Sequence, residues 1–235
     1  MSTQLNPAVS VILPILNEER DLQECISAIL KQDYAGDLEI ILALGPSTDN
    51  TNQIAKSLAE SDSRIKLVEN PTGKTAAALN LAIAAASNEI ICRIDGHSEI
   101  SNSYIKTAVE IMNQTGAVNV GGLMQADAKY GFQSVVATAM RSKIGVGASK
   151  FHTGGEAGPA DTVYLGTFKK SAILQAGGFD EKYIRAQDWE LNHRLRLNGG
   201  VIWFDPRLVV TYRPRDTFSK LAKQYFEYGR WRRAV

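Results

Sequence analysis

The amino-acid sequence predicts an α/β fold in which helices flank a mainly parallel central sheet. Short β-branched runs alternate with segments of helical spacing through the first half of the chain. Several of these runs are apolar throughout, as expected of strands that are covered on both faces. Strands joined by crossover helices form parallel sheets. The 235 residues are 44% hydrophobic and 22% charged, which is enough apolar material for one large domain.

The first half of the chain supplies most of the strand and helix pairs. Ser47, Thr48 and Asp49 are residue types that begin helices, so a helix should start beside them. An Ala- and Leu-rich segment after Lys74 has high helix propensity. In order, we expect strands at residues 9–13, 38–44, 65–68, 89–94 and 118–120, and helices at 22–30, 48–58, 75–86 and 105–112.

The second half has a different composition. Residues 145–161 contain five glycines and few large apolar side chains, which predicts a long loop. Residues 218–233 carry a stripe of apolar and small residues, as an amphipathic helix does. We further expect helices at 132–144, 171–175 and 186–197 and strands at 162–168 and 201–204. The two halves, about 9–122 and 123–235, are expected to share one sheet and to form a single domain of residues 1–235.

Positive charge is concentrated at the C-terminal end. The whole chain has a net charge of only +1, but residues 207–235 contain eight Lys or Arg against two acids, a local charge of +6. A basic tail of this kind indicates an anionic partner, which is a phosphate, a phospholipid or a nucleic acid. A solvated basic face of a helix is the alternative interpretation.

The cysteines and the N-terminus indicate the compartment. Cys25 and Cys92 lie in apolar contexts without metal-ligand spacing, and a reducing, cytosolic compartment is the default for such a pair. The polar N-terminal residues 1–8 predict no signal peptide. No apolar run approaches the roughly 20 residues that span a bilayer.

Three loops should lie at the edge of the sheet where ligands bind. In parallel sheets this is the edge formed by the carboxyl ends of the strands, and the loops are residues 14–19, 45–49 and 95–99. In the third loop, Asp95 and His97 are two residues apart just past a strand, so both can face one divalent cation that holds a phosphate. Taken alone, the pair is weak evidence for a metal, because an Asp-Gly pair is also an ordinary turn and a nearby histidine is usually solvated.

Seven segments, in order, resemble those of the family 2 glycosyltransferases, and the resemblance covers nearly the whole chain. Their forms here are most similar to those of succinoglycan-type enzymes of bacterial exopolysaccharide assembly. The segments are Pro-x-x-Asn-Glu at 14–18, Gly-Pro-Ser-Thr-Asp-Asn-Thr at 45–51, Gly73-Lys74 before an Ala-rich stretch up to Asn80, Asp95-Gly96-His97 in place of Asp-x-Asp, residues 169–181 before the catalytic acid, Gln187-Asp188 in place of Glu-Asp, and Tyr228-Gly229-Arg230-Trp231.

The resemblance implies the A-type nucleotide-sugar fold and an inverting transfer. A sugar would move from a nucleotide-diphosphate donor, with UDP-sugars favoured, to a hydroxyl of a saccharide or lipid-linked saccharide. Asp188 would be the catalytic base. Asp95 and His97 would bind a divalent cation, Mn²⁺ or Mg²⁺, although an imidazole suits Mg²⁺ less. The residues that would contact the nucleotide sugar are Pro14, Asn17, Glu18, Gly45, Lys74, Asp95, Arg230 and Trp231.

The chain also departs from the family pattern. Leu44 and Gly45 stand where two aspartates are common, so Gly45 cannot accept a hydrogen bond from uracil through a side chain. Gln187 replaces a glutamate beside the base, so a raised pKa of Asp188 would need burial or another carboxylate, such as that of Glu190.

Two other functions are the alternatives. A catalytically impaired nucleotide-sugar-binding module would show such losses. A sugar nucleotidyltransferase would carry a Gly-rich, basic segment after the first strand, where this chain is acidic. No nucleic-acid partner is expected. The expected location is cytoplasmic, and the basic C-terminal helix could contact the cytoplasmic face of a membrane.

Overall fold

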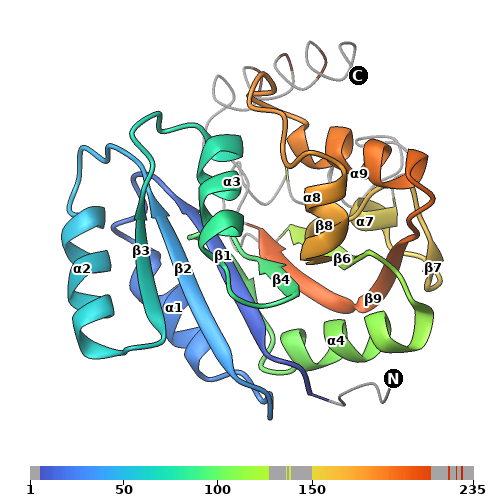
Figure 1. The fold of residues 1–235 in the computed structure, drawn as a ribbon, viewed down its shortest axis with the longest axis horizontal. Coiled ribbons are helices and arrows are strands. Elements are labelled where there is room, and N and C mark those ends of the chain that lie inside the picture. Colours follow the sequence, from blue (N-terminus) through green and yellow to red (C-terminus); the bar gives the residue numbers. More distant parts are fainter. Residues whose placement is uncertain are drawn as a thin grey trace.

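A computed structural model describes residues 6–126, 136, 138, 150–212, 222, 226 and 229. Within them a nine-stranded sheet lies between two layers of helices (Figure 1). The strands are β1 (Val9–Ile15), β2 (Leu38–Leu44), β3 (Ile65–Glu69), β4 (Ile90–Arg93), β5 (Glu99–Ile100), β6 (Asn119–Ala126), β7 (Gly158–Pro159), β8 (Tyr164–Lys169) and β9 (Ile202–Tyr212). The helices are α1 (Leu22–Leu30), α2 (Thr51–Ser61), α3 (Thr75–Ala85), α4 (Tyr104–Thr115), α7 (Lys150–Thr153), α8 (Lys170–Gln175) and α9 (Gln187–Leu197).

The strand order is β3-β2-β1-β4-β8-β6-β9-β5, with β7 paired to β9. The strands β1 to β4 form a parallel block, and β9 runs parallel to β6. The strand β8 enters between β4 and β6 and is antiparallel to both. Most paired residues therefore lie in parallel ladders, and the predicted α/β class with a mainly parallel, helix-flanked sheet is confirmed.

Each face of the sheet carries its own apolar core because successive strand residues point to opposite faces. Along β1, Val11 and Leu13 face the core that α1, α2 and α4 cover, whereas Ile12 faces the core that α3, α8 and α9 cover. Both cores are almost free of solvent contact, so the sheet is a rigid base for the loops at its ends.

Two strands of the second half extend beyond the predicted limits. β6 continues to Ala126 and β9 to Tyr212, whereas strands were expected only at residues 118–120 and 201–204. A bulge explains the difference, because the register between β6 and β9 shifts at Gly121. A Cβ atom on Gly122 would lie 1.9 Å from the carbonyl oxygen of Leu208, so only glycine fits there.

Other boundaries differ more modestly. α2 begins at Thr51 rather than at residue 48, because the Asp49 carboxylate accepts the N–H of Thr51 at 3.0 Å and holds residues 49–51 in a turn before the helix. The loop predicted at 145–161 contains α7 and β7, so that prediction was wrong for its described part. Helices were expected at residues 132–144 and 218–233, and nearly all residues of these two ranges lie outside the described part of the chain. No helix in the described part of the chain is long and apolar enough to cross a membrane.

Candidate active site

The loops after β1 and β2 are joined by the side chain of Asn17. The Oδ1 atom of Asn17 accepts the backbone N–H of Thr48 at 2.8 Å, and the backbone N–H of Asn17 donates to Ser47 Oγ at 3.1 Å. Asn17 has a φ of 57°, a left-handed conformation that asparagine tolerates better than most residues. The N–H of Glu18 donates to Thr51 Oγ1 at 2.7 Å. Two of the three predicted ligand loops therefore form one hydrogen-bonded unit.

Gly45 lies where these loops touch. Its N–H donates to the carbonyl oxygen of Ile15 at 2.7 Å, and a Cβ on Gly45 would lie 3.0 Å from Leu16 Cδ1 and 3.4 Å from the Cα of Gly73. Glycine at this position thus allows close packing of three loops. The neighbouring Lys74 is exposed at the start of α3, and Pro14 is half-buried near the end of β1.

The third loop packs against the first through Gly96. A Cβ on Gly96 would lie 2.9 Å from Ile15 Cδ1 and 3.0 Å from Glu18 Cγ. This close approach brings His97 Nδ1 to 2.8 Å from Glu18 Oε1. Two residues predicted for different roles, Glu18 for the nucleotide and His97 for the metal, are therefore partners of each other.

A buried arginine joins the two aspartates of the site. Arg93, the last residue of β4, is only 4% exposed. Its Nε and Nη2 donate to Asp95 Oδ1 at 3.1 and 3.0 Å, and its Nη1 donates to Asp188 Oδ1. Burial alone would lower the pKa of Arg93, but Asp188 and Asp95 raise it above its ordinary value. The guanidinium is therefore a permanent cation between two carboxylates.

Asp188 lies in the first turn of α9. The chain enters this helix through Ala186 at a φ of 60°, and the Asp188 side chain is 30% exposed. Burial raises the pKa of Asp188, the Asp95 charge raises it further, and Arg93 opposes both effects. Asp95, rather than the expected Glu190, is the second carboxylate. Glu190 is instead bound by Arg194, with two contacts of 2.5 Å.

Asn80 on α3 holds the segment that leads to α9. Its Oδ1 accepts the N–H of Phe179 at 2.8 Å, and its Nδ2 donates to the carbonyl oxygen of Phe179 at 2.9 Å and to Glu181 Oε1 at 3.0 Å. Gly178, with a φ of 76°, makes room for this amide, since a Cβ there would lie 2.9 Å from Asn80 Oδ1. Asn80 therefore links the first half of the fold to the segment before Asp188.

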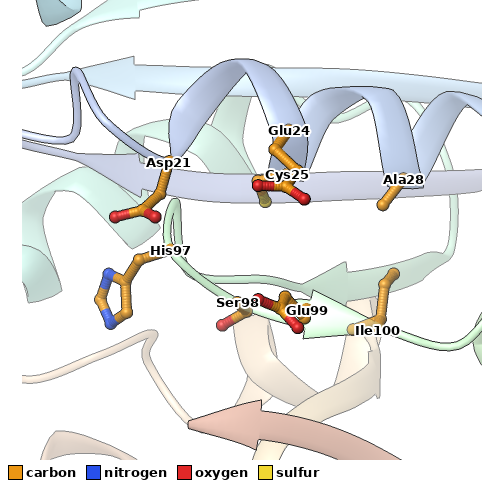
Figure 2. Close-up of a pocket in the computed structure, with 8 residues that line it drawn as sticks. All are labelled: Asp21, Glu24, Cys25, Ala28, His97, Ser98, Glu99 and Ile100. Carbon is orange, nitrogen blue, oxygen red and sulfur yellow. The ribbon is translucent and has the colours of Figure 1, made fainter. Parts of the chain in front are cut away.

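A small pocket of about 190 Å³ opens beside the third loop. Figure 2 shows α1 residues along one side of it and the segment from His97 to Ile100 along the other. Asp21, Glu24 and Glu99 make its lining acidic. The Cys25 thiol also lines it, and burial raises the pKa of that thiol to about 12, so the thiol is unreactive at neutral pH.

The family is shown by comparison with known proteins. The model of the family described as "Glycosyl transferase family 2" matches residues 10–166, which run from β1 into β8. The chain belongs to this family. The glycosyltransferase is 34% identical to succinoglycan biosynthesis protein ExoA of Rhizobium meliloti over 94% of this chain and 68% of that protein. It is 27% identical to dolichyl N-acetyl-alpha-D-glucosaminyl phosphate 3-beta-D-2,3-diacetamido-2,3-dideoxy-beta-D-glucuronosyltransferase of Methanococcus voltae, over 94% of this chain and 71% of the relative.

Solved structures agree with the fold of the glycosyltransferase. TarS of S. aureus in complex with UDP has a TM-score of 0.69 at 18% identity, over 87% of this chain and 60% of that one. Mannosyltransferase PcManGT of Pyrobaculum calidifontis, in complex with GDP-Man and Mn²⁺, has a TM-score of 0.71 at 23% identity, over 92% and 60%. At these identities the comparison supports the A-type fold. The chain spans about 60% of the length of both structures.

The structure brings together most of the residues that the sequence predicted for the glycosyltransferase site. Asn17, Glu18, Gly45 and His97 meet where the first three loops pack, and Asp95 meets Asp188 through Arg93. Sequence reasoning missed the role of Arg93, although an arginine within an apolar strand and two positions before an aspartate was a visible signal. Arg230 and Trp231 lie outside the described residues.

Proposed function

We propose that this glycosyltransferase transfers a sugar, with inversion, from a nucleoside-diphosphate donor to a hydroxyl of a saccharide or lipid-linked saccharide. The product would be a polysaccharide of the cell envelope, in line with the succinoglycan biosynthesis named for its relative from Rhizobium meliloti. The observation that carries the proposal is the pairing of Asp188 and Asp95 through one buried arginine, at the edge of the sheet where the loops converge. In this pairing Asp188 can act as the base, while Asp95, on the other side of the guanidinium, can bind on the side of the nucleotide sugar.

Asp188 is the base in this reaction. The acceptor oxygen attacks the anomeric carbon, its proton passes to the Asp188 carboxylate, and the bond to the nucleoside diphosphate breaks with its electron pair. A raised pKa makes the carboxylate a stronger base than an ordinary aspartate. Its partial exposure leaves access for an acceptor hydroxyl.

The loops after β1 and β2 would bind the nucleotide. Asn17 holds them in one arrangement, so little ordering accompanies binding. Pro14, Glu18, Gly45 and Lys74 lie on or beside these loops. UDP-sugars are the donors to test first, and GDP-mannose is the next, since solved structures of the same fold hold UDP and GDP-Man.

The oxygen ligands at Asp95 fit a divalent cation that is also bound by the diphosphate of the nucleotide sugar. No group of three or more His, Cys, Asp and Glu in the described part of the chain could hold a metal by itself. Both guanidinium contacts to Asp95 are made to Oδ1, which leaves Oδ2 as a ligand, and Mg²⁺ sites commonly combine one or two carboxylates with substrate phosphates. Bound there, Mn²⁺ or Mg²⁺ would neutralise charge on the leaving diphosphate. His97 would be a further ligand.

The two halves of the chain would divide the substrates between them. Residues 9–122 carry the loops assigned to the nucleotide, and residues 123–235 carry Asp188 and the basic tail that would meet the acceptor or an anionic membrane surface. The free, buried thiols of Cys25 and Cys92 are in keeping with the cytoplasmic face of that membrane.

The test of the proposed function is release of nucleoside diphosphate from a panel of nucleotide sugars. UDP- and GDP-sugars are each incubated with saccharide and lipid-linked acceptors, with Mn²⁺, with Mg²⁺ and with a chelator. We expect acceptor-stimulated, cation-dependent release from one donor. Binding of a nucleotide sugar without release from any donor would instead favour the impaired binding module.

The role of Asp188 is tested by Asp188→Asn. We expect transfer to fall by at least about 100-fold, because the amide cannot take the proton. Donor affinity, measured by calorimetry with the nucleotide sugar, should change little. Asp161→Asn is the matched control, because Asp161 is 81% exposed and lies in the same half of the chain. Loss of donor binding in Asp188→Asn would refute its role as the base.

A further inference from the structure

The strand β4 ends in a residue that its environment does not favour. The residues before Arg93 in this strand, Ile90, Ile91 and Cys92, are apolar and buried, and β1 and β8 flank the strand on either side. An arginine here loses its hydration, a cost that a protein offsets only by pairing the charge. Both partners of Arg93 are carboxylates to which the proposed function gives a role.

The contacts of Arg93 fix both carboxylates through one planar group. Nε and Nη2 hold Asp95, and Nη1 holds Asp188, so the guanidinium sets the relative position of the two side chains. Lysine could not do this, because a single ammonium lacks the planar fork. The contact with Arg93 is made to Oδ1 of Asp188, which leaves the second carboxylate oxygen for a substrate hydroxyl.

Arg93 also balances charge during the reaction. In the resting site one guanidinium and two carboxylates carry a formal charge of −1. When Asp188 takes the proton of the acceptor, its charge is neutralised and the formal charge of the three groups becomes zero. This happens as the departing diphosphate gains negative charge on the Asp95 side. Arg93 disfavours this proton uptake in the resting site, but once Asp188 is neutral the guanidinium charge is balanced by Asp95 alone and can stabilise the negative charge that develops on the diphosphate.

We propose that Arg93 is a positioning residue for transfer, which orients the base Asp188 and couples its protonation to charge on the donor side through Asp95. This inference rests on the proposed function and deepens it. Arg93 acts through the two aspartates, so its loss should affect turnover more than donor binding.

The first experiment compares Arg93→Lys with Arg194→Lys. Arg194 is the matched control, because it is also an arginine that pairs with a carboxylate of α9 but lies outside the site. We expect Arg93→Lys to lower kcat at least about tenfold with nearly unchanged donor KM, since orientation is lost and binding is kept. The control should retain wild-type kcat. Equal losses in both variants would make the role of Arg93 purely structural and overturn the proposal.

The second experiment uses chemical rescue and a double variant. Millimolar guanidinium should restore part of the transfer activity of Arg93→Ala and none of that of Asp188→Asn. In an Asp188→Asn background, Arg93→Lys should cause no further loss of kcat, because both substitutions disable the same base. If Arg93→Ala does not fold, the double variant still tests the proposal. Losses of kcat that add up when Arg93→Lys and Asp188→Asn are combined would overturn it. A wild-type enzyme without transfer would refute the proposed function itself, whereas a fully active Arg93→Lys would refute only the role of Arg93.

Discussion

Asp188 should control the acidic side of the pH profile. The base acts when deprotonated, so kcat/KM should fall as pH drops through its pKa. Because burial and Asp95 raise that pKa, the acidic limb should lie above the value of about 3.9 that is ordinary for aspartate. Steady-state rates with a saturating acceptor across acidic pH would measure it. A limb at the ordinary value would contradict the environment described for Asp188.

Tyr104 offers a second test at the scale of a single residue. Its ring is 1% exposed in the core beneath α4, and its hydroxyl has no hydrogen-bond partner among the described residues. Tyr104→Phe should leave the free energy of unfolding unchanged or raise it by up to about 1 kcal/mol, because a buried unpaired hydroxyl is removed. Urea denaturation followed by circular dichroism would show the change.

The matched control is Tyr34→Phe. The hydroxyl of Tyr34 donates to the carbonyl oxygen of Pro7, so its removal deletes a hydrogen bond. This variant should lose about 1 kcal/mol. A larger loss in Tyr104→Phe than in Tyr34→Phe would mean that the Tyr104 hydroxyl has a partner after all.

At the scale of elements, the turn between α8 and α9 depends on close packing against Asn80. Gly177 and Gly178 both have positive φ, at 86° and 76°, but only Gly178 faces the Asn80 amide. Gly177→Ala should cost about 1 kcal/mol from backbone strain alone, and Gly178→Ala at least about 2 kcal/mol, because a clash is added. Thermal unfolding of the two variants would compare them. Equal costs would show that the Asn80 contact contributes little.

The elements that could be predicted from sequence are those with local signals. The strands of the parallel block are short apolar runs, and the helices between them have regular apolar spacing, so their positions were predicted to within a few residues. β5 and β7 have two residues each and exist only through pairing with β9, which no local pattern encodes. The extension of β9 past Pro206 likewise depends on β6.

The same limit applies to the site. Asp95 and Asp188 were identified because each lies in a segment that resembles the family pattern. Their connection through Arg93 was not identified, because the Arg93–Asp188 contact joins residues 95 positions apart and depends on how α9 packs against the sheet. The pairing of His97 with Glu18 was missed for the same reason, since it requires Gly96 to bring the two loops together.

At the scale of the whole molecule, the two thiols should report different kinds of opening. Cys25 lines the pocket beside α1, whereas Cys92 is fully buried in β4, and burial raises the pKa of each to about 12. Both should react slowly with a disulfide reagent at pH 8, since little thiolate is present. Cys25 should react first, through local opening, and Cys92 only on global unfolding.

Single-cysteine variants, Cys25→Ala and Cys92→Ala, would assign the two phases. Each variant retains one thiol, so its reaction rate can be followed with increasing urea. The rate at Cys92 should track the global unfolding equilibrium measured by circular dichroism. Rapid labelling of Cys92 in the native protein would contradict the closed sheet.

The position of β8 has a consequence for synthesis of the chain. β8 lies between β4 and β6 in the sheet, yet it follows both in sequence. During synthesis, β4 and β6 are therefore complete before the strand that pairs with both of them exists. Until then β4 presents an unpaired apolar edge, and such edges recruit other chains. Fragments that end before Tyr164 should therefore aggregate, and ribosome-bound chains of that length are the stage at which a chaperone is most needed.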